Sequence, residues 1–276
     1  MKPTIGHTVP QGDGKIESVF TPPEYLSASS INTFRDCQMK FKIGRFDNIK
    51  EPPSWAMHLG SFTHEVLENL YDLAPEDRTL ESLKQLAGEL WTANEWEPKV
   101  LALEEPQGDI KAFKIAAFSN MTNLWKLEDP TETDLDEVEF KVEAEVEGVR
   151  MLGYIDRLQF NDEGSAIISD YKTGKIPNPN FKSEDDKFFQ LLAYALMLEA
   201  ESGVPTAQVE LLYLTQSAKH ELAATPVKLS IAKGTIVETK ENLDAACASG
   251  NFHTNVGNLC NWCYYKKTNI CPAFPK

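Results

Sequence analysis

The chain has 276 residues, of which 42% are hydrophobic and 25% charged, so it can form a packed core of one or two domains and is not disordered along most of its length. Its 27 basic and 42 acidic residues leave a net charge of −15, which argues against a protein that coats nucleic acid through bulk positive charge. No apolar run approaches the roughly 18 to 20 residues of a membrane span, and the first residues lack a signal-peptide hydrophobic region, so we expect a soluble, cytosolic protein.

Residues 1–22 are rich in Pro, Gly and Thr, and we expect an N-terminal arm there. A helix is predicted after a Ser cap at position 27 or 29, because apolar residues then recur at helical spacing. These residues are Ile31, Phe34, Cys37 and Phe41. The segment from Arg35 to Lys50 carries a net charge of +3, which leaves room for a basic groove, although a solvated face without a partner explains the run equally simply.

A second helix is predicted after Gly60-Ser61. Its apolar stripe consists of Phe62, Val66, Leu67 and Leu70. His64 therefore lies on a neighbouring face of this helix, away from the stripe. Two further amphipathic helices, Leu80–Trp96 and Asp109–Leu127, carry no obvious chemistry, and we expect them to build a helical lobe.

From Glu139 the apolar period changes from about 3.6 to 2, which predicts a half-exposed strand whose outward side is acidic. Two more strands, Val149–Phe160 and Ser165–Lys172, are joined by a hairpin-forming sequence at residues 161–164. If Asn161 pairs with Ser165 around a three-residue loop, the numbers of paired residues sum to 326. This register places Asp156 directly opposite Asp170.

The pair Asp156 and Asp170 predicts a cation site. Side chains directly opposite on one face of an antiparallel pair have Cβ atoms about 4.5 to 5.5 Å apart, and two carboxylates that close repel unless a cation lies between them. Lys172 is two residues beyond Asp170 and projects from the same face of the strand. A lone D-x-K motif also arises by chance from surface charges, but the predicted pairing favours a site.

The next helix is predicted to begin at Ser183, which has capping-box spacing to Asp186. It is almost wholly apolar apart from Gln190 and Tyr194, which share one face. Because a buried amide must find a hydrogen-bond partner, we expect Gln190 to point at the carboxylate pair, whereas Tyr194 is explained equally well as a core aromatic. The remaining predicted elements are strands at Gln208–Thr215 and Val227–Ile231 and a polar helix up to Ser249.

Three of the five cysteines form a C-x2-C-x7-C pattern near the end of the chain: Cys260, Cys263 and Cys271. Such spacing in a chain without a secretion signal favours a metal ion or an iron–sulfur cluster over disulfides. The fourth ligand is open among Cys37, Cys247 and His253. Of these, Cys37 alone lies in a distant part of the chain, where it could connect the N-terminal helix to the tail.

The motifs together resemble those of RecB-type nucleases of the PD-(D/E)xK superfamily. They are Gly60-x3-His64, Gly153-x2-Asp156, Asp170-x-Lys172-Thr173-Gly174 and Gln190-x3-Tyr194, in this order. The cysteine arrangement also resembles the iron–sulfur subset, which includes the AddB-type nuclease domain and the CRISPR-associated single-strand exonucleases.

The resemblance implies an α/β restriction-endonuclease-like core with a mixed central sheet flanked by helices, plus a helical iron–sulfur lobe that joins the N- and C-terminal segments. We expect a single nuclease domain at residues 23–276, with a helical lobe at about 75–130, a core at about 135–235 and a cluster-binding segment at about 250–276.

The resemblance also assigns roles to residues. The groups that it implies for holding Mg²⁺ or Mn²⁺ are Asp156, Asp170, the carbonyl of Tyr171 and His64. Lys172 is implied to be the catalytic lysine, and Gln190 and Tyr194 to position the site and contact nucleic acid. The implied ligands of a [4Fe–4S] cluster are Cys37, Cys260, Cys263 and Cys271. A structural zinc ion on the same thiolates is the alternative on ligand chemistry.

The expected function is therefore a metal-dependent DNA exonuclease that acts on single strands or DNA ends in recombination, repair or phage DNA processing. We expect it in the cytoplasm of a bacterial or phage-infected cell. No phosphate-binding G-x4-G-K-[ST] loop occurs, so unwinding would need a helicase or recombination partner. The alternative is a non-catalytic DNA-binding or scaffold subunit of a helicase–nuclease complex.

Overall fold

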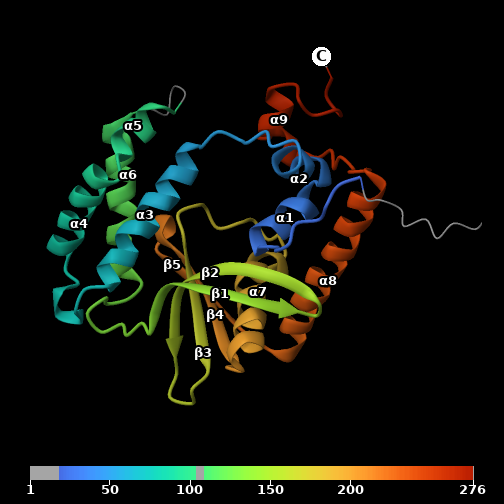
Figure 1. Cartoon of the computed structure of the whole chain (residues 1–276). Helices are drawn as coiled ribbons and strands as arrows, with labels where there is room; N and C mark the ends of the chain where they lie inside the picture. Colours follow the sequence, from blue (N-terminus) through green and yellow to red (C-terminus); the bar gives the residue numbers. More distant parts are fainter. Residues whose placement is uncertain (1–18, 104–108, 276) are drawn as a thin grey trace, which may run out of the picture.

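The computed structural model describes residues 19–103 and 109–275, and most of the expected N-terminal arm lies outside this range. A mixed sheet of five strands, in the spatial order β1-β2-β3-β4-β5, forms the centre of the fold (Figure 1). Its strands are β1 (Glu137–Val146), β2 (Val149–Phe160), β3 (Ala166–Lys172), β4 (Thr206–Tyr213) and β5 (Ala218–Ala223). Strands β3 and β4 pair in parallel and the other neighbours are antiparallel, so the predicted mixed sheet is confirmed.

Two hairpins set the register of the first three strands. Glu147 and Gly148 form the tight turn between β1 and β2, and both have the positive φ angles, 49° and 79°, that a two-residue hairpin turn requires. Between β2 and β3, Arg157 pairs with Ser169 and Phe160 with Ala166, so paired numbers sum to 326. The register predicted from the sequence is therefore confirmed.

Helix α7 (Glu184–Ser202) makes the crossover that allows β3 and β4 to run parallel, and it packs against β1 and against α8 (Pro226–Ser249). Its apolar run, from Phe188 to Leu198, is buried except for Gln190. The predicted cap is present, since the Ser183 hydroxyl accepts a hydrogen bond from the Asp186 backbone N–H at 3.1 Å. These contacts fix the middle of α7, from Phe188 to Leu198, against its neighbours.

One predicted strand is wrong. Residues 227–231 belong to α8, because the Thr225 hydroxyl accepts from the backbone N–H of Lys228 and Pro226 occupies the first helical turn. The last strand of the sheet is instead β5, whose alternating polar and half-buried residues give only a weak apolar signal.

A second hydrophobic cluster lies beside the sheet and is built by α3 (Trp55–Tyr71), α4 (Leu80–Ala93), α5 (Trp96–Leu101) and α6 (Ile110–Thr122). Figure 1 shows these helices together on one side of the molecule. The helix predicted at 80–96 ends early, because Glu95 adopts a left-handed backbone and starts a separate helix. Three short 3₁₀ turns complete this part: η1 (Pro75–Asp77), η2 (Asn123–Lys126) and η3 (Leu214–Gln216). In the described ranges, no helix combines the length and apolar character that crossing a membrane requires.

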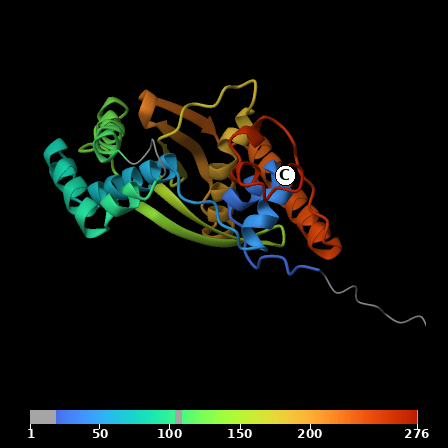
Figure 2. The ribbon, with the colours of Figure 1, turned by 90° about the horizontal axis from the view of Figure 1, so that it is seen from above.

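The helices that follow residue 27 lie beside the C-terminal tail on the other flank of the sheet (Figure 2). The helix predicted through Phe41 is two helices, α1 (Ala28–Asp36) and α2 (Gln38–Arg45), because Cys37 between them is extended with φ −166°. The tail contains η4 (Asn258–Asn261) and α9 (Tyr264–Lys267). Backbone hydrogen bonds join the two ends, for example from Met39 N–H to the His253 carbonyl at 3.0 Å.

Candidate active site

Asp156 on β2 and Asp170 on β3 lie next to each other on the sheet. The last bridged pair of the two strands is Arg157 with Ser169, and the following position in that register brings Asp156 opposite Asp170. The Asp156 Oδ2 atom accepts a hydrogen bond from the backbone N–H of Tyr171 at 3.3 Å. Asp170 is 3% exposed, so its carboxyl group is almost removed from water.

His64 projects from α3 onto this pair. Its Nδ1 atom lies 3.1 Å from Asp156 Oδ2, and its Nε2 atom lies 2.8 Å from the carbonyl oxygen of Tyr171. Both neighbours are hydrogen-bond acceptors, so the ring satisfies both by donating from both nitrogens. The apolar stripe of α3 is buried in the helical cluster, and this packing turns the neighbouring face, with His64, toward the strands.

Lys172 and the polar face of α7 complete the arrangement. The Lys172 ammonium forms an ion pair with the Asp170 carboxylate and donates a hydrogen bond to Gln190 Oε1 at 3.2 Å. Gln190 in turn donates from Nε2 to the Tyr194 hydroxyl at 3.1 Å. Gln190, which is half-buried, thus reaches the predicted carboxylate pair through Lys172 and not by a direct hydrogen bond.

Gly153 on β2 makes room for the Tyr194 ring. A Cβ atom at this position would lie 3.2 Å from Tyr194 Cδ1 and closer still to Cε1, so a larger residue would displace the ring. The glycine of the Gly153-x2-Asp156 motif therefore serves a close approach between β2 and α7.

The carboxylates and the imidazole change one another's acidity. Burial and the charge of Asp156 raise the pKa of Asp170 to about 7, and the nearby Lys172 opposes the rise only in part. Burial disfavours the charged ring of His64, but the hydrogen bond and charge of Asp156 outweigh it and raise the pKa of His64 to about 9. Burial would likewise raise the pKa of Asp156, yet the hydrogen bond to His64 lowers it. His64 and Asp170 therefore both keep their protons to a higher pH than an unperturbed side chain does, at a site where several acidic groups lie close together.

Glu139 joins the site although its strand pattern predicts an outward-facing residue. Its carboxylate, the His64 ring and the Asp156 carboxylate each offer a ligand atom within 4.8 Å of the others. The signal that could have found it is the turn at Glu147-Gly148, because the register of that hairpin places Glu139 opposite Asp156. The same pairing arithmetic that located Asp170 would have worked here.

These groups fit a divalent metal ion. Carboxylate and carbonyl oxygens are the ligands that Mg²⁺ and Mn²⁺ prefer, and an imidazole shifts the preference toward Mn²⁺. Burial, together with the charge of Asp156, raises the pKa values of both Asp170 and Glu139, and a bound cation would relieve this electrostatic condition.

A buried ion pair holds the three metal-site elements together. Arg157, 1% exposed, donates from one guanidinium nitrogen to both oxygens of Glu128, at 2.8 and 2.9 Å. Its guanidinium also lies 5.2 Å from the ring centroids of Tyr71 on α3 and Tyr171 on β3. Because Arg157 follows Asp156 on β2, its contacts with the two tyrosine rings link α3, β2 and β3 directly behind the site.

The family profile of the PD-(D/E)XK nuclease superfamily matches residues 25–272. The chain belongs to this superfamily. Its sheet and flanking helices match the fold, and nuclease activity is the function that this membership supports.

Two known proteins are similar to the chain, one in sequence and one in fold. The chain is 26% identical over 201 residues to the Gene 69 protein of Mycobacterium phage D29, an alignment that covers 64% of this chain and 70% of the phage protein. The crystal structure of a proposed exonuclease from Eubacterium rectale superimposes with a TM-score of 0.55 and 13% sequence identity, covering 87% of this chain and 88% of that one. The second similarity concerns the fold alone.

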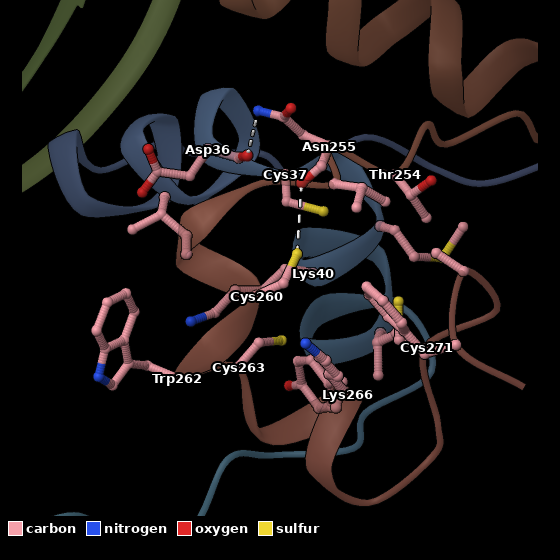
Figure 3. A pocket seen from close by; sticks show the side chains of 17 residues that line it. Asp36, Cys37, Lys40, Thr254, Asn255, Cys260, Trp262, Cys263, Lys266 and Cys271 are labelled. Carbon is pink, nitrogen blue, oxygen red and sulfur yellow. Dashed lines mark hydrogen bonds between the residues drawn. The ribbon is translucent and has the colours of Figure 1, made fainter. Parts of the chain in front are cut away.

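A second group of possible ligands lies where the N-terminal helices α1 and α2 meet the C-terminal tail. The sulfur-bearing residues Cys37, Cys260, Cys263 and Cys271 line one cavity of about 200 Å³, several times the roughly 30 Å³ of a water molecule (Figure 3). Neither of the other two ligand candidates lines this cavity: Cys247 is buried on α8, and His253 contacts the N-terminal helices through a backbone hydrogen bond to Met39. The geometry therefore favours Cys37 as the fourth member.

Proposed function

We propose that this protein is a metal-dependent DNA exonuclease that hydrolyses phosphodiester bonds of single-stranded DNA or of DNA ends. The observation that carries the proposal is the convergence of His64 from α3 with Asp156, Asp170, the Tyr171 carbonyl and Lys172 on the adjacent strands β2 and β3. Phosphodiester hydrolysis needs a cation site and an adjacent positive group, and these residues supply both. We propose phage DNA processing, recombination or repair as the process, since all three require this chemistry, and one sequence relative comes from a phage.

Each residue has a distinct task in this proposal. Asp156, Asp170 and the Tyr171 carbonyl would hold Mg²⁺ or Mn²⁺, and His64 would add a nitrogen ligand. Such an ion, when bound, polarises the scissile phosphate and lowers the pKa of a bound water. Lys172 lies beside Asp170, where its ammonium can donate to the attacking water or to a phosphate oxygen. Gln190 accepts a hydrogen bond from Lys172 and so limits the positions of that ammonium.

The matched variants Asp170→Asn and Asp162→Asn test the site. Both remove one carboxylate charge, but Asp162 is exposed in the turn between β2 and β3. We expect Asp170→Asn to lower the initial rate of Mn²⁺-dependent digestion of labelled single-stranded DNA by more than about a hundredfold, because even groups behind a metal ligand contribute ten- to a hundredfold. Asp162→Asn should digest at the wild-type rate.

Two results would contradict the proposal. Equal digestion by wild type and Asp170→Asn would remove the site, and a wild-type protein that binds DNA without hydrolysing it would favour the non-catalytic scaffold. End-blocked and circular single strands then separate exonuclease from endonuclease action. We expect circular DNA to survive conditions that degrade linear DNA of the same sequence.

We further propose that the cysteine cavity holds a [4Fe–4S] cluster. Four thiolates on one zinc ion stand about 3.8 Å apart, given a Zn–S distance of about 2.3 Å. Among the described residues, no three cysteine sulfurs lie within 4.8 Å of one another. A wider spacing around a cavity suits a cluster better than a single ion, and Cys37 would tie α2 to the tail through it.

Spectroscopy and metal analysis of the purified protein test the cluster. We expect a brown protein with about four iron and four sulfide per chain. Cys260→Ser should lose colour and iron, whereas Cys247→Ser, which changes a buried cysteine outside the cavity, should keep both. A colourless protein with one zinc per chain, lost in Cys260→Ser, would establish the zinc alternative.

A further inference from the structure

Lys187 and His220 form a pair of donors beside the candidate active site. The Lys187 ammonium, near the start of α7, donates a hydrogen bond to Nδ1 of His220 on β5 at 2.9 Å. Burial and the Lys187 charge lower the pKa of His220, so the imidazole is neutral and its Nδ1 atom can accept. Both residues are half-buried, so the pair borders the solvent.

The sheet register places His220 in one row with the proposed metal-site carboxylates. Asp170 on β3 pairs with Leu211 on β4, and Leu211 pairs with His220 on β5. Because paired residues of neighbouring strands project from the same face, His220 lies on the face that carries Asp170, two strands away. At about 4.8 Å per strand, this separates their backbones by about 10 Å. The Tyr213 ring lies beside His220, with 5.2 Å between the ring centroids, and its pKa is raised first by burial and then by the charge of Asp170.

Helix α7 gives the same placement independently. Lys187 lies three residues before Gln190, and residues at this spacing share one face of a helix. Gln190 accepts the hydrogen bond from Lys172 of the site at 3.2 Å. The polar face of α7 that begins at Tyr194 therefore continues through Gln190 to Lys187, about one helical turn of 5.4 Å further on.

The Lys187 ammonium has no acidic partner, although the chain carries a net charge of −15. The acidic residues just before it form ion pairs with other side chains. They are Glu184 and Asp185, which pair with Lys228, and Asp186, which pairs with Arg35. Among the residues that the structure describes, His220 is the hydrogen-bond partner of the ammonium. Two ammonium N–H groups and the Nε2–H of His220 thus remain to donate to an anion.

We propose that Lys187 and His220 bind a backbone phosphate of the DNA strand, next to the phosphate that is cleaved. This inference rests on the proposed nuclease function and extends its site to a neighbouring nucleotide. The ammonium supplies positive charge and the imidazole a second donor. Contacts to phosphates fix the register of a strand without reading its bases, so the pair keeps the strand aligned with the carboxylates.

DNA binding by the full-length protein in EDTA tests the proposal without hydrolysis. The probe is a fluorescent single-stranded oligonucleotide of mixed sequence, and its anisotropy gives the affinity at several NaCl concentrations. We expect Lys187→Ala to weaken binding about tenfold at low salt, because it removes a charge-assisted hydrogen bond. The slope of log affinity against log salt should become shallower by about 0.7, the value for one phosphate of a single strand. The control Lys84→Ala, at an exposed position of α4, should change neither quantity.

Further variants show whether the two side chains act on one phosphate. His220→Phe keeps a ring beside Tyr213 but removes both nitrogens, and it should weaken binding about threefold. Combined with Lys187→Ala, it should weaken binding by less than the product of the two single effects, because both groups contact the same phosphate. Lys187→Arg keeps the charge and should keep the wild-type salt slope. A purely structural role of Lys187 would leave that slope unchanged even in Lys187→Ala.

The outcomes separate this inference from the proposed function. If the wild type digests DNA in Mn²⁺ but Lys187→Ala matches Lys84→Ala in affinity and salt slope, the phosphate site is overturned and the nuclease remains. A wild type that digests DNA in Mn²⁺ but does not bind it in EDTA also overturns the phosphate site, because these donors need no metal. A loss of affinity confined to one base sequence would likewise contradict a phosphate contact. A wild type that neither binds nor digests DNA overturns both proposals.

Discussion

The acidic site and the cysteine cavity both have the residues of a cofactor site, but they differ in what holds those residues in place. His64, Asp156, Asp170 and Lys172 stand on helices and strands and hydrogen-bond or ion-pair with one another. The cysteines stand at helix ends and in the tail, and Cys260 makes only weak contacts to the backbone of Asn255 and Gly257. The acidic site is therefore formed by the fold, whereas we expect the cavity to depend on the proposed cluster for rigidity.

The largest expected effect comes from a chelator, which should affect the acidic site but not the cysteine cavity. EDTA should abolish nuclease activity completely, and Mn²⁺ should restore it, because the divalent ions are exchangeable while thiolate-bound iron is not. The colour should not change, whereas loss of an ion bound among the carboxylates should lower the melting temperature. Activity that survives EDTA, or colour that disappears with it, would show that the two regions are not independent in this way.

The next largest effect is expected from Lys172→Met. Loss of a donor aimed at the reacting phosphate typically costs about a hundred- to a thousandfold in rate. We expect a loss of this size in the maximal rate of DNA digestion, with Mn²⁺ affinity changed little because Lys172 is not a ligand. A variant that digests DNA normally, or that fails to bind Mn²⁺, would contradict this role.

Arg157→Met tests whether the buried ion pair supports the acidic site. Removing one partner of a buried pair costs about 3 to 5 kcal/mol, and we expect about 3 kcal/mol in the free energy of unfolding because Glu128 keeps 17% exposure of its side chain. Denaturant unfolding measures it. The double variant Arg157→Met with Glu128→Leu should recover part of the loss, since no charge is then left unpaired. If Arg157→Met is as stable as wild type, the Arg157–Glu128 pair does not stabilise the fold.

The smallest expected effect concerns Gly153. Gly153→Ala should destabilise the protein by about 1 to 2 kcal/mol, because the new methyl group meets the Tyr194 ring between two packed elements. The control Gly234→Ala, on α8 with open space around it, should leave stability unchanged or raise it by up to about 1 kcal/mol. Equal stabilities of the two variants would contradict the role of Gly153 in the close approach of β2 and α7.

The same contrast explains what the sequence could predict. Hairpin turns set strand register, so Asp156 and Asp170 could be paired from numbering alone. The polar Gln190 on an apolar helix could be placed near them, although it contacts Lys172 and not the carboxylates themselves. Strand alternation predicts the outward face for Glu139, because it assumes a regular strand backbone. The left-handed φ angle of Glu139 breaks that regularity, and the local sequence does not indicate it. The local pattern likewise does not predict the break at Cys37, because helical periodicity continues across this residue. Contacts between the chain ends depend on tertiary packing that local patterns do not contain.

The most direct test of the account is a crystal structure of the protein with Mn²⁺, in which anomalous scattering locates the ion. We expect an Mn²⁺ peak bonded to one oxygen of Asp156 and one of Asp170, with the Tyr171 carbonyl completing that side. A map in which Mn²⁺ binds elsewhere, or in which the two carboxylates do not share an ion, would contradict the central claim.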